Sequence, residues 1–191
     1  MKRMIGLVAV VFSLLSVSAL AKDKKPMADE FTGVFINMDT PGAMGSQVSI
    51  WVESYTADDV AQQLKVILAD KGQQALHNAI TDYRAGTLRI GTANSYPISV
   101  ARQRVNADGS RVVFLASIRP FSGFAPTAGS QKDQYPFGVI ELKLDAEGKG
   151  EGTIIGSAQL NFDAEKNNLS VASYATQPAR ISEVKTKPKK Q

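Results

Sequence analysis

Along most of this 191-residue chain, hydrophobic and polar residues alternate with a period of two, the pattern of a β-strand with one buried face. Clusters of glycine, proline and aspartate separate the alternating segments, as expected of turns. The alternation predicts about nine strands, at residues 31–38, 48–55, 88–90, 98–105, 112–118, 137–144, 153–162, 169–174 and 179–184.

The segment between residues 57 and 83 departs from this alternation and has the spacing of an amphipathic helical pair. Thr56 and Asp59 stand at the three-residue spacing of a capping box, which predicts the N-terminus of the first helix. Lys71 followed by Gly72 fits a helix C-terminus, so we expect a second short helix after it. The buried face of the first helix is predicted to contain Val60, Leu64, Ile67 and Leu68.

Two predicted strands flank the Asp-Gly pair at residues 108–109, which is the pair that a two-residue type I′ hairpin turn prefers. Such a turn fixes the register of the two strands. It predicts that Val105 pairs with Val112 and that Gln103 pairs with Phe114.

The fold class follows from the order of these elements. Consecutive strands joined by hairpin turns imply antiparallel pairing rather than a parallel sheet. We therefore predict an α+β domain that is mostly an antiparallel β meander, or a partial barrel, with one helical pair near residues 57–83 covering one face or end.

The first 21 residues have the three parts of a cleavable secretory signal peptide. Lys2 and Arg3 give a basic start, a hydrophobic run follows, and Ala19-Leu20-Ala21 matches an A-x-A cleavage site. An uncleaved anchor is the alternative, although the run is at the short end of the roughly 17–25 residues that span a bilayer. We expect export to the periplasm or the extracellular space, with no integral membrane span after cleavage.

The remaining residues are expected to form one globular domain with charged ends. The predicted division is a signal peptide at 1–21, a polar N-terminal tail at 22–30, a single domain at 31–184 and a Lys-rich C-terminal tail at 185–191. The formal net charge of the chain is +4, but residues 26–184 hold 13 basic and 17 acidic residues. The basic excess therefore belongs to the ends, which argues against nucleic-acid binding, because that needs a basic face on the folded domain.

Catalytic and metal-binding patterns are sparse in this sequence. The chain has no cysteine and one histidine, His77, so neither a catalytic triad nor the usual zinc ligand set is predicted. Asp145, Glu147 and Glu151 lie in a glycine-rich segment that fits a solvated turn better than a calcium loop. We predict no catalytic, cofactor-binding or metal-ligating residue and no cofactor, and the sequence favours a protein that is not an enzyme.

The long segment between Pro120 and Pro136 is a candidate binding loop. Unstructured segments of this length are uncommon inside compact domains and are often functional. It carries Phe121, Phe124 and Tyr135, aromatic residues that could form an adaptable contact surface. The alternative is that these side chains fold back and cover one open end of the sheet.

Arg102 and Arg104 are a candidate anion-binding patch. They stand two residues apart on one predicted strand, so both side chains project from the same face. The alternative is that they form surface ion pairs with residues such as Glu141, which contribute little individually.

Three phrases of the sequence support a resemblance. They are the run from Tyr135 to Leu142 (YPFGVIEL), the run from Gly148 to Gly152 (GKGEG), and Tyr174 to Pro178 ahead of Arg180. With these phrases, most of residues 31–184 resembles a family of uncharacterised exported bacterial proteins. The resemblance implies a domain of the bacterial envelope and implies no activity.

Together these observations predict an exported soluble domain that binds a small apolar or anionic ligand, or another envelope protein. One alternative is a hydrolase-type enzyme that uses carboxylates without histidine. Another is a structural domain that associates with an anionic surface through its Lys-rich tails. The sequence leaves the ligand and the oligomeric state open.

Overall fold

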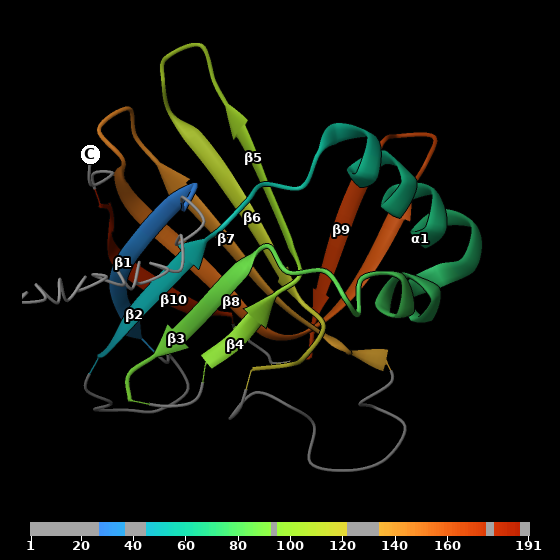
Figure 1. Cartoon of the computed structure of the whole chain (residues 1–191), viewed down its shortest axis with the longest axis horizontal. Helices are drawn as coiled ribbons and strands as arrows, with labels where there is room; N and C mark the ends of the chain where they lie inside the picture. Colours follow the sequence, from blue (N-terminus) through green and yellow to red (C-terminus); the bar gives the residue numbers. More distant parts are fainter. Residues whose placement is uncertain (1–26, 37–44, 93–94, 122–133, 175–177, 188–191) are drawn as a thin grey trace, which may run out of the picture.

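A computed structural model of the chain describes residues 27–36, 45–92, 95–121, 134–174 and 178–187 (Figure 1). The predicted signal peptide lies outside these residues. The strands are β1 (Asp29–Ile36), β2 (Ser46–Val52), β3 (Gly86–Ile90), β4 (Ser95–Ile98), β5 (Val100–Val105), β6 (Arg111–Ser117), β7 (Phe137–Leu144), β8 (Lys149–Asp163), β9 (Asn168–Ser173) and β10 (Ala179–Thr186), and the helix is α1 (Asp58–Ala79).

All ten strands belong to one antiparallel sheet, which confirms the predicted α+β meander. The strand order is β4-β3-β2-β1-β10-β8-β7-β6-β5, and β9 pairs with β8 beside this path. The sheet curls into a nearly closed barrel, and α1 lies outside it against one flank (Figure 1).

The two terminal strands of the curled sheet, β4 and β5, are consecutive in the sequence and meet at Ser99. The backbone N–H of Ala85 donates to the carbonyl of Ile98 at the end of β4 (2.8 Å). The next residue, Ser99, donates its N–H to the carbonyl of Ala116 in β6 (2.8 Å). The strand predicted at residues 98–105 corresponds to β5, and β4 before it was not predicted. At Ser99, between the two strands, the hydrogen bonding passes from one edge of the sheet to the other.

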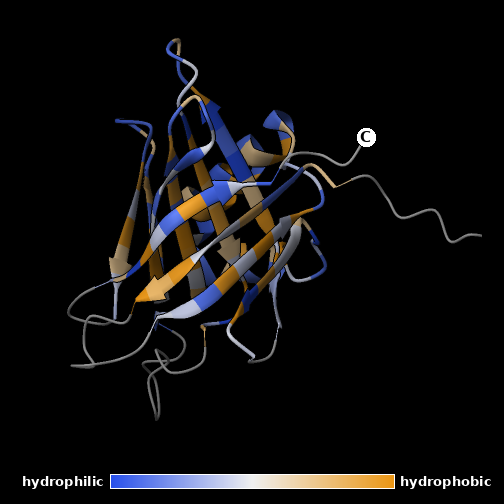
Figure 2. Cartoon of the chain, turned by 90° about the vertical axis from the view of Figure 1, so that its left-hand side faces the viewer, coloured by the Kyte–Doolittle hydropathy of each residue, from blue (hydrophilic) through white to orange (hydrophobic). Residues whose placement is uncertain are grey.

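One hydrophobic cluster occupies the space that the sheet encloses, and along the strands hydrophobic and hydrophilic bands alternate (Figure 2). Its largest fully buried side chains come from strands all round the barrel and from the segment after β6: Phe31, Ile50, Leu88, Ile98, Leu115, Phe121, Ile140, Leu142, Ile154 and Ile181. Gly138 makes room for one of them, because a Cβ at that position would lie 2.6 Å from the ring of Phe121. The barrel interior is therefore a packed core.

A second hydrophobic cluster lies outside the barrel, between α1 and strands β7 and β8. Leu64, Leu68 and Leu76 of the helix are buried there, as the spacing of apolar residues predicts for the first two. Gly72 adopts a positive φ of 76°, which interrupts α1 and confirms the predicted division into two helical pieces.

The predicted capping box at the start of the helix is wrong. The N-cap residue is Ala57, and it makes no side-chain hydrogen bond. The Thr56 hydroxyl instead accepts a hydrogen bond from the backbone N–H of Ala101 (3.2 Å), and the Thr56 N–H donates to the Ala101 carbonyl (2.8 Å). A tertiary contact to β5 has therefore taken the side chain that the local pattern assigned to the cap.

The predicted register of the β5–β6 hairpin is wrong by one residue. Val105 pairs with Arg111, and Gln103 pairs with Val113. The turn holds three residues rather than two, and its last residue, Gly109, has a φ of 81°. This turn is stabilised because the Asp108 carboxylate accepts hydrogen bonds from both the backbone and the hydroxyl of Ser110.

The ends of the described domain are more ordered than the sequence predicts. Strand β1 begins at Asp29, and β10 continues to Thr186. Beyond it the Lys187 ammonium forms an ion pair with Glu30. Within the described residues, no helix has the length and apolar character needed to cross a membrane.

Candidate functional site

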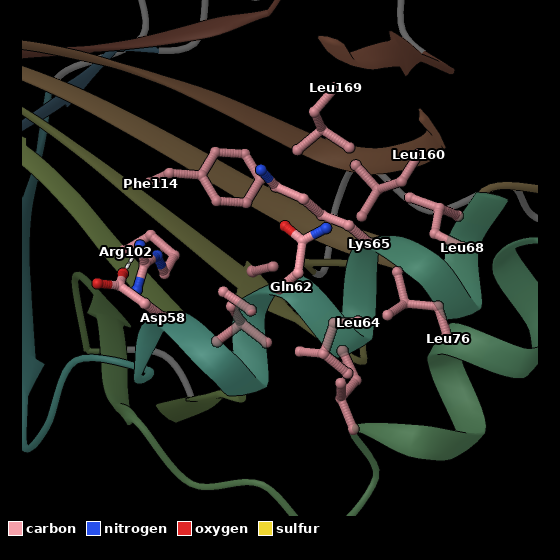
Figure 3. Close-up of a pocket in the computed structure, with 14 residues that line it drawn as sticks. Asp58, Gln62, Leu64, Lys65, Leu68, Leu76, Arg102, Phe114, Leu160 and Leu169 are labelled. Atoms are coloured by element: carbon pink, nitrogen blue, oxygen red, sulfur yellow. Dashed lines mark hydrogen bonds and ion pairs between the residues drawn. The ribbon is translucent and has the colours of Figure 1, made fainter. Parts of the chain in front are cut away.

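A half-open apolar groove of about 500 Å³ lies between α1 and the outer face of the barrel (Figure 3). From the helix and the turn after it, its wall is formed by Ala61, Leu64, Leu68, Leu76 and Ile80. From the sheet, its wall is formed by Val100, Phe114, Ala116, Leu160 and Leu169. We call this space the α1 groove.

Short side chains explain why the α1 groove is not filled. Ala61 on the helix and Ala116 on β6 both line it, and each contributes only a methyl group to its walls. Neighbouring positions carry leucines, which hold the helix on the sheet through the second hydrophobic cluster. The result is a cleft bounded by a rigid helix and a rigid sheet, since protein interiors otherwise pack with few voids larger than a water molecule.

Polar side chains lie at one end and along the opening of the α1 groove. Figure 3 shows Asp58 and Arg102 together at one end, with Gln62 and Lys65 between them and the leucines. Arg102 forms an ion pair with Asp58 and donates a second hydrogen bond to the carbonyl of Thr56. The Asp58 side chain is 93% exposed and the Arg102 side chain 36% exposed, so the ion pair faces solvent.

Lys65 lies along the opening, between the charged pair and the leucines (Figure 3). Its ammonium is 5.5 Å from the centre of the Phe162 ring and 3.3 Å from the side-chain oxygen of Asn167. A cation over an aromatic face is attracted by the ring, and its aliphatic stem covers apolar surface. Lys65 therefore bridges the helix and the β8–β9 turn above the α1 groove.

The structure places both residues of the predicted anion patch on the outer face of β5. Arg102 pairs with Phe114 in the sheet register and lines the α1 groove, whereas Arg104 is exposed two residues further along. The ion pair that Arg102 forms is with Asp58, and Glu141 pairs with Lys143 (3.2 Å). Arg102 is thus part of an ion pair and also a wall of the groove.

The aromatic residues of the predicted binding loop do not share one environment. Phe121 is 1% exposed, belongs to the barrel core and meets the Tyr96 ring edge-on at 5.2 Å. Tyr135 is half-buried, and its ring lies 5.5 Å from that of Tyr174. Phe124 lies outside the described residues, so its predicted role stays a prediction.

A polar network that no sequence pattern predicted lies at one end of the barrel. Arg111 forms an ion pair with Asp29 (3.1 Å) and hydrogen-bonds Thr186 (3.0 Å), and the Tyr55 hydroxyl donates to Asp29 (2.8 Å). Burial, together with the hydrogen bond to Asp29 and its negative charge, raises the pKa of the Tyr55 phenol well above its ordinary value. Because Arg111 also lies 5.3 Å over the Phe31 ring, the network seals the barrel core from solvent.

Other groups that could carry chemistry are engaged locally. The His77 Nε2–H donates one hydrogen bond to the carbonyl of Ile118 (3.0 Å), and the ring packs beside that of Phe137. The Asp145 carboxylate caps its own turn by accepting N–H bonds from Glu147 and Lys149. In the portion of the chain that the structure describes, no three His, Cys, Asp or Glu side chains form a group that could hold a metal ion.

One signal in the sequence could have revealed the α1 groove. Residues 112–118 and 137–140 are apolar on both strand faces rather than on one. A strand with two apolar faces needs a second layer to cover its outer face. The only predicted element available for that layer was the helical pair, so the helix–sheet interface could have been anticipated.

Comparisons of this chain with known protein families, with curated proteins and with solved structures gave no match. The family resemblance of the sequence therefore stays an expectation.

Proposed function

We propose that this protein is a non-enzymatic binding module that holds a small apolar or amphipathic ligand in the α1 groove. The observation that carries the proposal is the half-open space of about 500 Å³ lined mainly by aliphatic side chains. Ligand pockets are typically about 300–1,000 Å³, mostly apolar, with a few polar groups that fix orientation. The α1 groove has that size and composition.

The two alternative functions have less support from the described residues. A carboxylate-based hydrolase needs two carboxylates facing one reacting position. Asp58 is the one carboxylate among the lining residues described for the α1 groove, and it is paired with Arg102. Surface association through the C-terminal lysines is weakened because Lys185 lies in β10 and Lys187 pairs with Glu30.

The proposal is tested with the neutral fluorescent probe N-phenyl-1-naphthylamine, titrated into the purified protein. The wild type should enhance its fluorescence saturably, because the probe leaves water for an apolar site. Ala61→Leu extends a side chain into the α1 groove and should weaken binding at least about tenfold, equivalent to ~1.4 kcal/mol.

Ala69→Leu is the matched control, because it makes the same substitution at an exposed position of the same helix. It should bind the probe like the wild type. Equal binding by the two leucine variants, or no saturable binding by the folded wild type, contradicts the proposal. Far-UV circular dichroism of each variant checks that it is folded.

The location of the module in the bacterial envelope is part of the proposal and rests on the sequence of residues 1–21. Cleavage after Ala21 predicts a mature chain that begins at Lys22. The intact mass of the protein recovered from the periplasmic fraction of a bacterial host checks this. A full-length mass would contradict cleavage.

A further inference from the structure

We infer that the ligand of the α1 groove is a single-chain amphiphile with an anionic head, whose apolar chain lies against the leucines and whose head group binds Arg102. The inference rests on the proposed function and adds to it the chemical class and the orientation of the ligand.

The α1 groove is charged at one end and apolar at the other. Figure 3 shows the charged pair Asp58 and Arg102 at one end, and Leu68, Leu76 and Leu160 at the other. A purely apolar ligand would leave the charged end unused, and a purely polar one would meet the leucines without partners. A molecule with one polar and one apolar end matches both.

Arg102 is held at the charged end of the α1 groove by hydrogen bonds. Its guanidinium carries five N–H donors. Two hydrogen bonds are described for it, one to the carbonyl of Thr56 and one to the carboxylate of Asp58. The bond to Thr56 fixes the side chain at the end of the α1 groove, and a planar guanidinium then presents its fork to a carboxylate or phosphate.

Asp58, the present ion-pair partner of Arg102, is replaceable. Asp58 is the first residue of α1, and its side chain is 93% exposed. Its ion pair with Arg102 is therefore screened by water and contributes little to stability. An anionic head group can take the place of the Asp58 carboxylate. Asp58 then returns to solvent without leaving a buried charge.

The charged side chains of the α1 groove are more basic than acidic. The basic side chains that line the α1 groove are Arg102 and Lys65, against one acidic side chain, Asp58. Glu141, which pairs with Phe114 across the sheet, is neutralised by Lys143. The positive end of the helix dipole is at Asp58 as well, and the N-cap residue Ala57 gives it no side-chain cap. These positive charges favour an anionic head group over a neutral one.

The test is displacement of N-phenyl-1-naphthylamine by dodecanoate and by dodecanol at pH 8, below the concentration at which either aggregates. The two competitors have the same chain length and differ in the charge of the head. Arg102→Gln should weaken displacement by dodecanoate about tenfold, the loss expected for a charge-assisted pair, and leave displacement by dodecanol within about twofold. Asp58→Asn should strengthen dodecanoate binding, because it removes the competing carboxylate.

Arg104→Gln is the matched control, because it removes the same charge from an exposed position of the same strand. Arg102→Lys separates the guanidinium geometry from its charge. If Arg102→Gln changes both competitors equally or neither, or if Arg104→Gln carries the loss, the assignment of the head group is overturned while probe binding still supports the groove. If the probe does not bind the wild type, the proposed function itself fails.

Discussion

Two hydrophobic layers share the strands β6, β7 and β8, one on each face of the sheet, and they are packed differently. The layer inside the barrel is filled with large side chains that are less than 2% exposed, among them Phe31, Phe121 and Leu142. The layer outside, under α1, contains a groove of about 500 Å³. Small closed barrels such as lipocalins hold a ligand within the barrel. Here the barrel interior is packed, and the open space lies outside it.

The small residues of the two layers explain the difference. Inside the barrel, Gly138 and Gly152 let large neighbours approach, since a Cβ at Gly138 would lie 2.6 Å from Phe121 and one at Gly152 would lie 2.6 Å from Leu142. Outside, Ala61 and Ala116 line the α1 groove and no larger neighbour has moved in. A small residue therefore tightens a curved sheet but leaves space below a stiff helix.

The largest effect is expected for Phe121→Ala, which removes a buried ring from the packed interior of the barrel. Truncation of a fully buried phenylalanine should lower the free energy of unfolding by about 3–5 kcal/mol, because the cavity left in a closed core cannot collapse. Urea denaturation followed by circular dichroism measures it. A loss below about 1 kcal/mol would mean that Phe121 is dispensable for the core and belongs to a binding surface instead.

Leu64→Ala provides the contrast within the same experiment. Leu64 is 7% exposed but lines the α1 groove, so part of its surface has no packing partner. Its truncation should cost about 2 kcal/mol, at the lower end of the range for buried leucines. A cost equal to that of Phe121→Ala would show that the two layers are equally well packed.

The smallest effect is expected for Tyr55→Phe at the polar end of the barrel. The substitution removes the hydrogen bond to Asp29 and should cost about 1 kcal/mol near neutral pH. The pKa of Tyr55 is raised in the folded protein, so the neutral phenol is the favoured form there. Its contribution is complete below the unfolded value of 10.0 and is lost as the pH rises above it.

Urea denaturation of the wild type and of Tyr55→Phe at several pH values between 7 and 11 measures this effect. The difference in free energy of unfolding between the two proteins should shrink above about pH 10. Taking the difference between the two proteins at each pH removes the contributions that the substitution leaves unchanged. A difference that stays constant with pH would place Tyr55 in contact with solvent rather than in the sealing network.

The sequence predicted the elements of the fold well where one local rule decided them. Alternation located nine of the ten strands described and missed the short β4, and the glycine at position 72 located the break in the helix. Local rules failed where a tertiary contact competed with them. Thr56 contacts β5 instead of capping α1, and the turn at Gly109 gained one residue, which shifted the register.

The candidate site was predicted in part. Arg102 was singled out from its spacing, but a register wrong by one residue hid the fact that Phe114 is its neighbour. Phe121 was singled out for its loop, yet it packs in the barrel core. The α1 groove depends on the packing of α1, which ends at Ala79, against β5, which begins at Val100, and no local pattern encodes the distance between two packed layers.

The connection between β4 and β5 at Ser99 has a consequence for aggregation. An open ten-stranded sheet would present two long edges whose unpaired N–H and C=O groups could recruit strands of other molecules. In this chain the two terminal strands follow one another, and at Ser99 the backbone passes from hydrogen bonding with one edge of the sheet to hydrogen bonding with the other. With no cysteine in the sequence, no disulfide reinforces that connection. A change that opens the backbone at this one buried serine would therefore expose more of both edges to other strands.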